Sequence, residues 1–296
     1  TFAQLVAAML AMGATLHVHD FVAVVRLPRS FLTGLVAQVV VVPAFAYGLL
    51  AVTDLDPGVA IGLAILAAVP GGTVSNVFTF AGRGDVPLSI AITAVTSLAC
   101  VVTVPIVVGL LVGDHVPSDF DLPRARMAGE IVVTLLVPLG IGMAVLRRRP
   151  QVAGRLSRVA LIVTAVLIAV IVLGSAAAGR LDIEAFGLAN LGVVGGFAAA
   201  LAAIGLGASW ATRRPRPDVT AIALETTVRN TNLGLLVRTS VFTAAGGAAS
   251  ATADLALFTI LAFAGVSMAL TVPLVFAGRR SVGLGLLKPR PVVRSG

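Results

Sequence analysis

Two polar stretches, PGGTVSN at residues 70–76 and ETTVRNTN at residues 225–232, lie near the middle of long apolar runs. Proline and adjacent glycines break the hydrogen-bond ladder of a helix, and a broken helix in lipid persists only where protein or a wet cavity satisfies its freed backbone groups. The stretches share the pattern Thr-Val-x-Asn, and each is followed by a loop and one further apolar run. This arrangement is typical of inverted repeats with a polar site between them at the middle of a membrane.

The composition of the whole chain is that of a protein in lipid. Of its 296 residues, 58% are hydrophobic, 31 are glycine and only 11% are charged, whereas about a quarter of the residues in soluble domains are charged. The mean hydropathy is +1.06. Because Cys100 is the single cysteine, a disulfide framework, a CxxC redox pair and a Cys-rich metal site are excluded. We therefore expect an all-α protein that crosses the membrane many times.

Nine apolar runs have the length that a bilayer core of about 30 Å requires. The expected spans are residues 2–16, 30–52, 58–81, 87–112, 127–146, 156–178, 183–210, 219–244 and 255–276. If each repeat has five spans, residues 1–112 form the first repeat without its first helix, and residues 124–280 form the second. Residues 281–296 would be a basic cytoplasmic tail. The abrupt start at Thr1 agrees with a missing first helix.

Charges divide unevenly between the two sides of the expected bundle. Most of the 21 basic residues fall on the same side as the loop at residues 17–29, and most acidic residues fall on the other side. The positive-inside rule then places the C-terminus in the cytoplasm and Thr1 outside, in a multi-pass protein of the plasma membrane. This topology accounts for the net charge of +8 without any nucleic acid.

Glu225 is the charge that most needs a partner. A charged side chain at the centre of a helix in lipid costs about 2.5 to 3.5 kcal/mol on the insertion scale. An ion pair with Arg229 on the same helix face is one solution; we favour a hard cation that the nearby Ser, Thr and Asn oxygens also bind. Arg229 must then face Glu225, backbone carbonyls or an anionic ligand. For Arg238 we expect no partner beyond snorkelling to the surface, and for Glu130 solvation without a role.

A polar stripe follows the first interruption. Ser89, Thr93, Thr96, Cys100 and Thr103 are spaced to share one helix face. For the part from Thr96 to Thr103 we favour simple packing between helices. Ser89 and Thr93 lie nearest the interruption, and we expect them at the polar site.

The interrupted stretches and the stripe together resemble the bile acid:sodium symporter family. The resemblance rests on residues 70–76, Ser89, Thr93, Glu225 and Asn230, with further matches at residues 12–16, Asp20-Phe21, and Gln38 with Pro43. It implies an inverted-repeat secondary transporter of ten helices, of which this chain looks like the last nine. Two discontinuous helices would cross in a core domain of about residues 30–112 and 183–280, beside a panel domain of about residues 1–20 and 124–178.

The resemblance also implies two sodium sites. The first would be made by Ser75, Asn76, Ser89, Thr93 and Glu225. The second would use Gln38, Glu225 and carbonyls near Thr226 and Val228, and would be completed by a glutamine. Arg229 stands at that glutamine position, so we expect one sodium ion and question the second. Arg229 either takes the place of the second ion as a fixed positive charge or binds a substrate carboxylate directly through two parallel hydrogen bonds.

The expected substrate is a small organic anion. The second halves of the broken helices begin near Thr73 and Asn230, and helix N-termini favour carboxylate or sulfonate groups. We expect Thr73, Asn76 and Asn230 to bind it.

The resemblance implies sodium-coupled symport by alternating access of a bile-acid-like or pantoate-like anion. The alternative is a channel or a substrate-sensing membrane protein of the same fold without sodium coupling. Beyond the anion and the lipid bilayer, we expect no nucleic acid and no protein partner.

An enzyme is not expected. Intramembrane aspartyl proteolysis needs buried aspartates, and no aspartate lies at the middle of a span. His17, His19 and His115 fall at span ends or in loops, where they cannot serve serine or metal hydrolysis inside the membrane. Arsenite efflux would need a thiol near the interruption, and Cys100 lies beyond Thr93.

Overall fold

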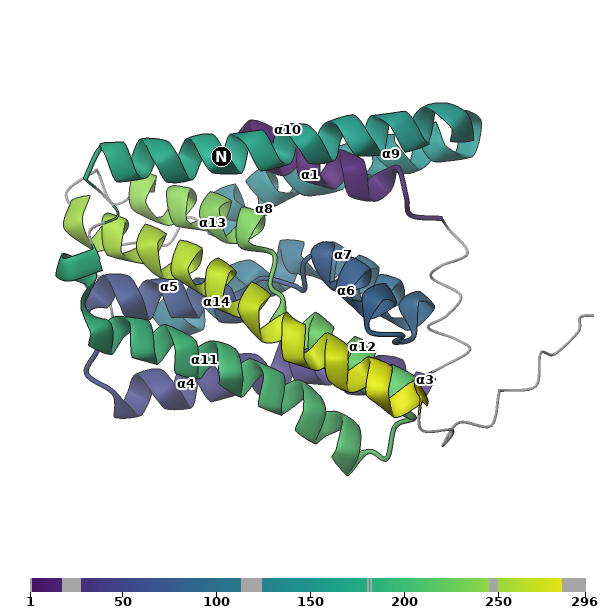
Figure 1. Ribbon diagram of the computed structural model, residues 1–296. Coiled ribbons are helices and arrows are strands. Elements are labelled where there is room, and N and C mark those ends of the chain that lie inside the picture. The colour runs from purple at the N-terminus through teal and green to yellow at the C-terminus, as the bar shows by residue number, and fades with distance from the viewer. Residues whose placement is uncertain are drawn as a thin grey trace, which may run out of the picture.

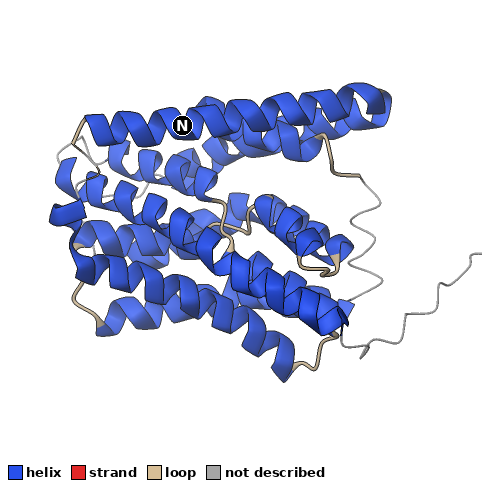
Figure 2. Cartoon of the chain, in the orientation of Figure 1, coloured by secondary structure: helices blue, strands red, loops and turns tan. Residues whose placement is uncertain are grey.

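The computed structural model describes residues 2–17, 28–112, 124–179, 181, 183–244 and 250–283, and within these ranges it is a bundle of helices without strands (Figures 1 and 2). Among the described residues, six helical segments are long and apolar enough to cross a membrane. They are Pro28–Val52, Val86–Val112, Arg124–Arg148, Pro150–Ala177, Phe186–Ala211 and Ala251–Arg280. The expected all-α membrane fold is confirmed.

Two of the long segments contain a short π-helical turn. The first segment consists of α3 (Pro28–Val36), η2 (Ala37–Val41) and α4 (Val42–Val52). The second consists of α8 (Arg124–Ile131), η4 (Val132–Leu136) and α9 (Val137–Arg148). Each turn ends just before a proline, Pro43 or Pro138. Because proline has no N–H to give to the preceding turn, the ladder loses one bond and widens there. Gln38 lies in the first of these turns.

The remaining long helices have no π-helical turn. These are α7 (Val86–Val112), α10 (Pro150–Ala177), α11 (Ile183–Ala211) and α14 (Ser250–Gly283). α7 and α14 each contain an internal proline, Pro105 and Pro273. α10 begins six residues before the expected span, because Pro150 stands in its first turn, where its fixed φ suits a helix start. Gly187 bends α11 near its start with a φ of 76°.

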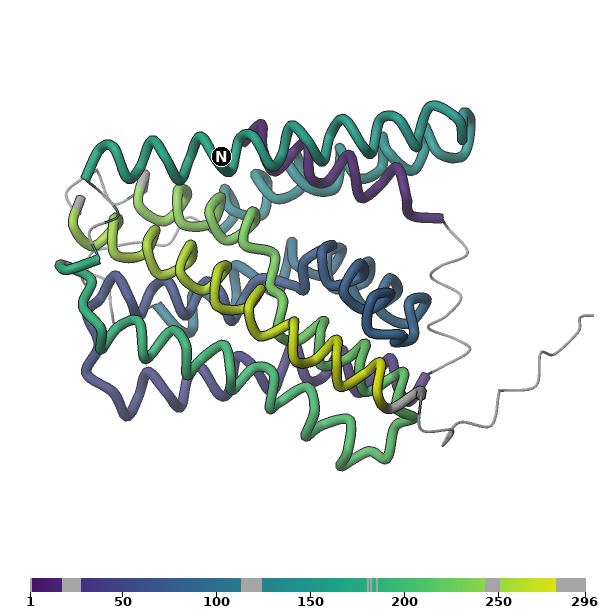
Figure 3. The backbone as a smooth tube through the Cα atoms, viewed as in Figure 1, coloured from purple at the N-terminus to yellow at the C-terminus, as the bar shows by residue number. Residues whose placement is uncertain are grey.

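Both predicted interruptions are real breaks. The first pair of half-helices is α5 (Pro57–Ala68) and α6 (Val74–Ala81), and the second is α12 (Arg216–Thr227) and α13 (Thr231–Ala244). The backbone is extended at Val69 and at Val228, where α5 and α12 end. Figure 3 shows the extended link between α12 and α13 in the interior of the bundle.

The half-helices α5 and α12 form the centre of the molecule. Every residue of α5 from Gly58 to Ala68 is buried, as is every residue of α12 from Asp218 to Thr227. α5 packs on α14 and α7, and α12 packs on α11 and α14. Phe186 of α11 stacks on Phe258 of α14, with ring centroids 4.3 Å apart. The polar ends of α5 and α12 are thus held deep inside a packed apolar bundle.

A separate group of helices runs along one side of the bundle. α1 (Phe2–Gly13) packs on α9 and α10, and Figure 1 shows these three together at the top of the view. Two glycines allow the close contact of α1 with α9. A Cβ on Gly13 would lie 2.1 Å from the Leu139 carbonyl oxygen, and one on Gly142 would lie 2.6 Å from the Ala14 nitrogen. Small residues at such positions let membrane helices approach closely.

This contact can be tested with two glycines of the same helix. Gly142→Ala should lower stability by about 1–3 kcal/mol, because the new methyl meets backbone that cannot yield. Gly140→Ala is the matched control, because nothing lies within 4 Å of its Cβ position and alanine favours the helix. Thermal unfolding of the purified protein in detergent should show a lower midpoint for Gly142→Ala and an equal or higher one for Gly140→Ala. Equal midpoints for the two variants would contradict the close packing of α1 on α9.

Candidate functional site

The two breaks meet and satisfy each other's backbone groups. The Gly72 nitrogen donates to the Val228 oxygen at 2.9 Å, and the Asn230 nitrogen donates to the Pro70 oxygen at 2.8 Å. These bonds form an antiparallel bridge between Gly71 and Arg229. Because no water is available in the bilayer core, this exchange is what allows both helices to stop there.

The glycine pair does more than end a helix. A Cβ on Gly71 would lie 2.5 Å from Glu225 Oε2, and one on Gly72 would lie 3.0 Å from the Arg229 carbonyl oxygen. Only glycine lets the two backbones and the Glu225 carboxylate come this close. The sequence indicated the glycines as helix breakers but gave no sign of this second requirement.

The Glu225 carboxylate is completely buried and is surrounded by hydroxyl groups. The hydroxyls of Ser75 and Ser89 each donate to its Oε1 at 2.5 Å, and the Thr93 hydroxyl lies 2.8 and 2.9 Å from its two oxygens. Asn76 joins the group, because its Oδ1 lies 2.7 Å from the Ser89 hydroxyl oxygen. The five residues expected at a first sodium site therefore lie together, on α6, α7 and α12.

The chemistry of this group suits a hard cation. Carboxylate, hydroxyl and amide oxygens are the ligands that such cations prefer, and hydroxyl hydrogens can rotate away to free the oxygens. Among the five residues only Glu225 is charged, so the group carries a single negative charge. In the described ranges there is no cluster of three His, Cys, Asp or Glu residues that would suit a transition metal.

Arg229 does not pair with Glu225. In the part of the chain that the structure describes, no Arg229 nitrogen lies within 4.0 Å of that carboxylate. Its Nε and Nη2 instead donate to the carbonyls of Leu66 and Ala67, and its Nη1 lies 3.5 Å from Gln38 Oε1. The two side chains do not share a helix face, because α12 ends at Thr227 and Arg229 lies beyond it, although the two opposite charges still attract each other.

The residues expected to bind substrate lie in or next to the first turns of α6 and α13. Thr73 precedes α6, and Asn230 precedes α13. Asn230 Oδ1 accepts from the Leu233 nitrogen at 3.1 Å, as a helix-capping side chain does. Of the remaining residues expected at a second sodium site, Thr226 donates its hydroxyl to the Ile222 carbonyl within its own helix.

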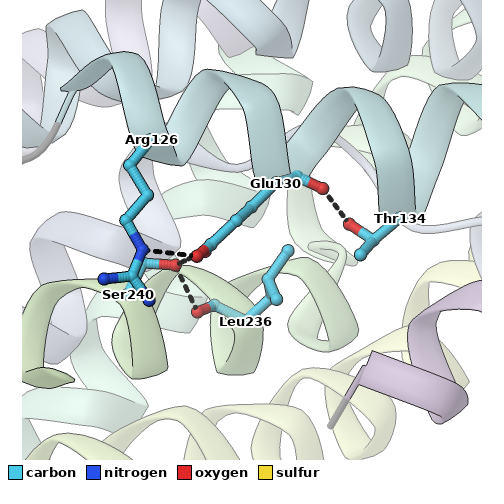
Figure 4. A network of polar contacts seen from close by, with 5 residues as sticks. All are labelled: Arg126, Glu130, Thr134, Leu236 and Ser240. Atoms are coloured by element: carbon cyan, nitrogen blue, oxygen red, sulfur yellow. Dashed lines mark hydrogen bonds and ion pairs between the residues drawn. The ribbon is translucent and has the colours of Figure 1, made fainter.

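Two charged residues have partners that sequence reasoning missed. The expectation for Arg238 was wrong, because its Nε donates to the Ala253 carbonyl at 2.9 Å and its Nη2 lies 3.7 Å from Asp254. Glu130 is only 18% exposed and accepts from Arg126 Nε at 2.9 Å and from the Ser240 hydroxyl (Figure 4). Glu130 therefore links α8 to α13 and is only partly exposed. Arg126 lies one helical turn before Glu130, whereas Ser240, Ala253 and Asp254 come from segments that no periodicity connects to Glu130 or Arg238.

The lower part of the polar stripe bonds within its own helix. The Thr96 hydroxyl donates to the Ile92 carbonyl, and the Cys100 thiol donates to the Ser97 carbonyl. Both side chains are buried, in agreement with the packing interpretation. Several sequence expectations concern residues outside the described ranges, namely Asp20-Phe21, His19, His115 and most of the tail at residues 281–296.

The closeness of Gly71 to the carboxylate can be tested by a double-mutant cycle. Gly71→Ala should lower stability by about 1–3 kcal/mol, because its methyl overlaps Glu225 Oε2. In a Glu225→Ala background the same change should cost at least about 1 kcal/mol less, because that oxygen is gone. Unfolding midpoints in detergent measure both, with Gly48→Ala as the control at an open helix position. Equal costs in the two backgrounds would contradict the contact.

Comparison with known proteins agrees with this architecture. Residues 3–181 match the sequence model of the Sodium Bile acid symporter family, a range that includes the first broken helix and ends before the second. An uncharacterized sodium-dependent transporter of Bacillus subtilis is 29% identical over 235 residues, which are 79% of this chain and 72% of the relative.

Two further relatives match over a smaller share of their length. A probable chloroplastic sodium/metabolite cotransporter of rice is 32% identical over 135 residues, 46% of this chain and 31% of the relative. The human sodium-dependent organic anion transporter is 29% identical over 164 residues, 55% of this chain and 43% of the relative. These relatives are transporters and not enzymes. The chain thus belongs to the sodium bile acid symporter family.

Proposed function

We propose that this chain is a sodium-coupled symporter of an organic anion that works by alternating access. The observation that carries the proposal is the fully buried Glu225 carboxylate, which lies within hydrogen-bond distance of the hydroxyls of Ser75, Ser89 and Thr93. An ionised group inside a membrane bundle requires a counter-charge, and such groups mark ion pathways. The Bacillus and human relatives are named as sodium-dependent transporters, which supports the choice of ion.

The sodium ion would bind among the oxygens of Ser75, Asn76, Ser89, Thr93 and Glu225. The hydroxyl oxygens of Ser75, Ser89 and Thr93 lie 2.5 to 2.8 Å from Glu225 Oε1, so their hydrogens can be donated to the carboxylate. When the ion enters, these hydrogens would turn away and the oxygens would face the ion. The site would change from a charge of −1 to neutral, which favours the arrival of an anion nearby. A second sodium at Gln38, Glu225, Thr226 and Val228 is questioned below.

The anion would bind near the starts of α6 and α13. Both half-helices begin at the crossing, so their positive ends lie close to the proposed sodium. Thr73, Asn76 and Asn230 are the proposed contacts for a carboxylate or sulfonate. The substrate class is bile-acid-like or pantoate-like. The human relative is named as an organic anion transporter, which supports this class.

Alternating access would move the panel against the core. We propose that α1 and α8 to α10 form the panel at about residues 1–20 and 124–178, and that the other helices form the core. α13 is joined to α8 by the Glu130–Ser240 bond and to α1 by the Gln4–Asn232 bond. On α6, by contrast, Val77 and Phe80 are 64% and 76% exposed. This difference suits a state closed on the α13 side, which we propose is the outer side in a plasma membrane, with the C-terminus in the cytoplasm.

Uptake into proteoliposomes tests the function directly. The reconstituted protein should accumulate one of a panel of anions, including taurocholate and pantoate, against its gradient when sodium is outside. Replacing sodium with choline, or Glu225 with Gln, should reduce this accumulation more than tenfold because the ion loses its only charged ligand. A channel would dissipate the gradient instead, and a sensor would bind the anion without accumulating it; either result would contradict symport.

Two serines of α7 offer a matched test of the ion ligands. Ser89→Ala should raise the sodium concentration for half-maximal uptake about tenfold, which corresponds to roughly 1.4 kcal/mol for one lost oxygen ligand. Ser97→Ala is the control, because Ser97 is also buried on α7 and its hydroxyl has no hydrogen-bond partner among the described residues. An equal sodium requirement in the two variants would argue against a sodium ion beside Ser89.

A further inference from the structure

The end of α5 leaves two carbonyls without the donors that a continuous helix would supply. Val69 closes the last regular bond, to the Ile65 carbonyl, at 3.0 Å. The next donor would be residue 70, which is proline and has no N–H for the Leu66 carbonyl. In a continuous helix the Gly71 N–H would donate to the Ala67 carbonyl. Here it donates to Gln38 Oε1 at 2.9 Å instead. Both orphan carbonyls lie in the buried centre, where water cannot satisfy them.

Arg229 supplies both missing donors. Its Nε donates to the Leu66 carbonyl at 3.0 Å, and its Nη2 donates to the Ala67 carbonyl at 2.9 Å. The side chain is only 3% exposed. A permanent positive charge therefore lies at the C-terminal end of a buried half-helix, where the helix dipole is negative and favours a cation.

This arrangement weighs against direct capture of a substrate carboxylate by Arg229. A bidentate fork needs two parallel N–H groups on one edge of the guanidinium. The edge formed by Nε and Nη2 is already bonded to backbone carbonyls, and Nη1 faces Gln38. A substrate would have to displace two bonds that the break in α5 requires.

The same arrangement weighs against a second sodium ion. Gln38 Oε1 accepts from the Gly71 nitrogen and lies 3.5 Å from Arg229 Nη1. The Val228 carbonyl accepts from the Gly72 nitrogen at 2.9 Å. Gln38 Oε1 and the Val228 carbonyl are thus already hydrogen-bonded, and Gln38 lies beside a fixed charge of the same sign as the ion.

We infer that Arg229 is a resident cation that takes the place of a second sodium ion, so that one sodium is coupled to each substrate. The inference rests on the proposed sodium site at Glu225. Without ligands, Arg229 and Glu225 sum to zero. With one sodium and one monovalent anion bound, the sum is again zero. The site where the two broken helices cross is then neutral in both the loaded and the empty carrier, so transport of a monovalent anion moves no net charge.

Sodium binding to the purified full chain tests this without knowledge of the substrate. The probe is radioactive sodium alone, in detergent, with choline as the replacing cation. The wild type should bind one ion per chain with a Hill coefficient of about 1. Arg229→Gln removes the charge and adds an oxygen ligand, and should bind two ions with a Hill coefficient that approaches 2. Arg229→Lys keeps the charge and should still bind one.

The outcomes separate this inference from the proposed function. Two ions in the wild type or in Arg229→Lys, or one ion in Arg229→Gln, would overturn the inference and leave sodium symport intact. No ion in the wild type, or undiminished binding in Glu225→Gln, would overturn the proposed function itself. Should Arg229→Gln fail to fold because the α5 carbonyls lose their donors, the counts for the wild type and Arg229→Lys still decide the question.

Discussion

A carboxylate held away from water at the point where two broken helices cross is the constraint on which the rest of this structure depends. Glu225 has no exposed surface, and an ionised group at that depth is tolerated only with compensation from its surroundings. Hydroxyls from α6 and α7 provide part of that compensation and are themselves ligands of the kind a monovalent cation would use. The same residues thus stabilise the carboxylate and form a place for an ion.

The backbone around this carboxylate solves a second problem of the membrane interior. Each broken helix frees N–H and C=O groups, and the two breaks satisfy one another through the bonds of Gly72 and Asn230. The carbonyls of Leu66 and Ala67 at the end of α5 take no part in this exchange, and the Arg229 side chain donates to both of them. Proline, glycine and arginine therefore act together. Proline stops the helix, glycine allows the close approach, and arginine supplies the donors that proline removed.

Much of this could be predicted from the sequence because it depends on local patterns. Apolar runs marked the spans, Pro70 and its glycines marked a break, and the spacing of Ser89 and Thr93 placed both hydroxyls on one face. The sequence could not predict which groups the Arg229 side chain contacts. Residues four apart face each other only within a continuous helix, and α12 ends at Thr227, before Arg229. The partners of Arg238 and Glu130 were missed because they depend on how separate helices pack. The sodium ligands and the panel and core division stay predictions.

The central claim is that the Glu225 carboxylate and the hydroxyls of α6 and α7 bind a sodium ion. The most direct measurement is a pair of high-resolution experimental structures, one in sodium chloride and one in choline chloride. The account predicts an ion among the oxygens of Ser75, Ser89, Thr93 and Glu225 in sodium only, with these hydroxyls turned from the carboxylate to the ion. The same hydroxyl–carboxylate hydrogen bonds in both salts, with no ion between them, would contradict it.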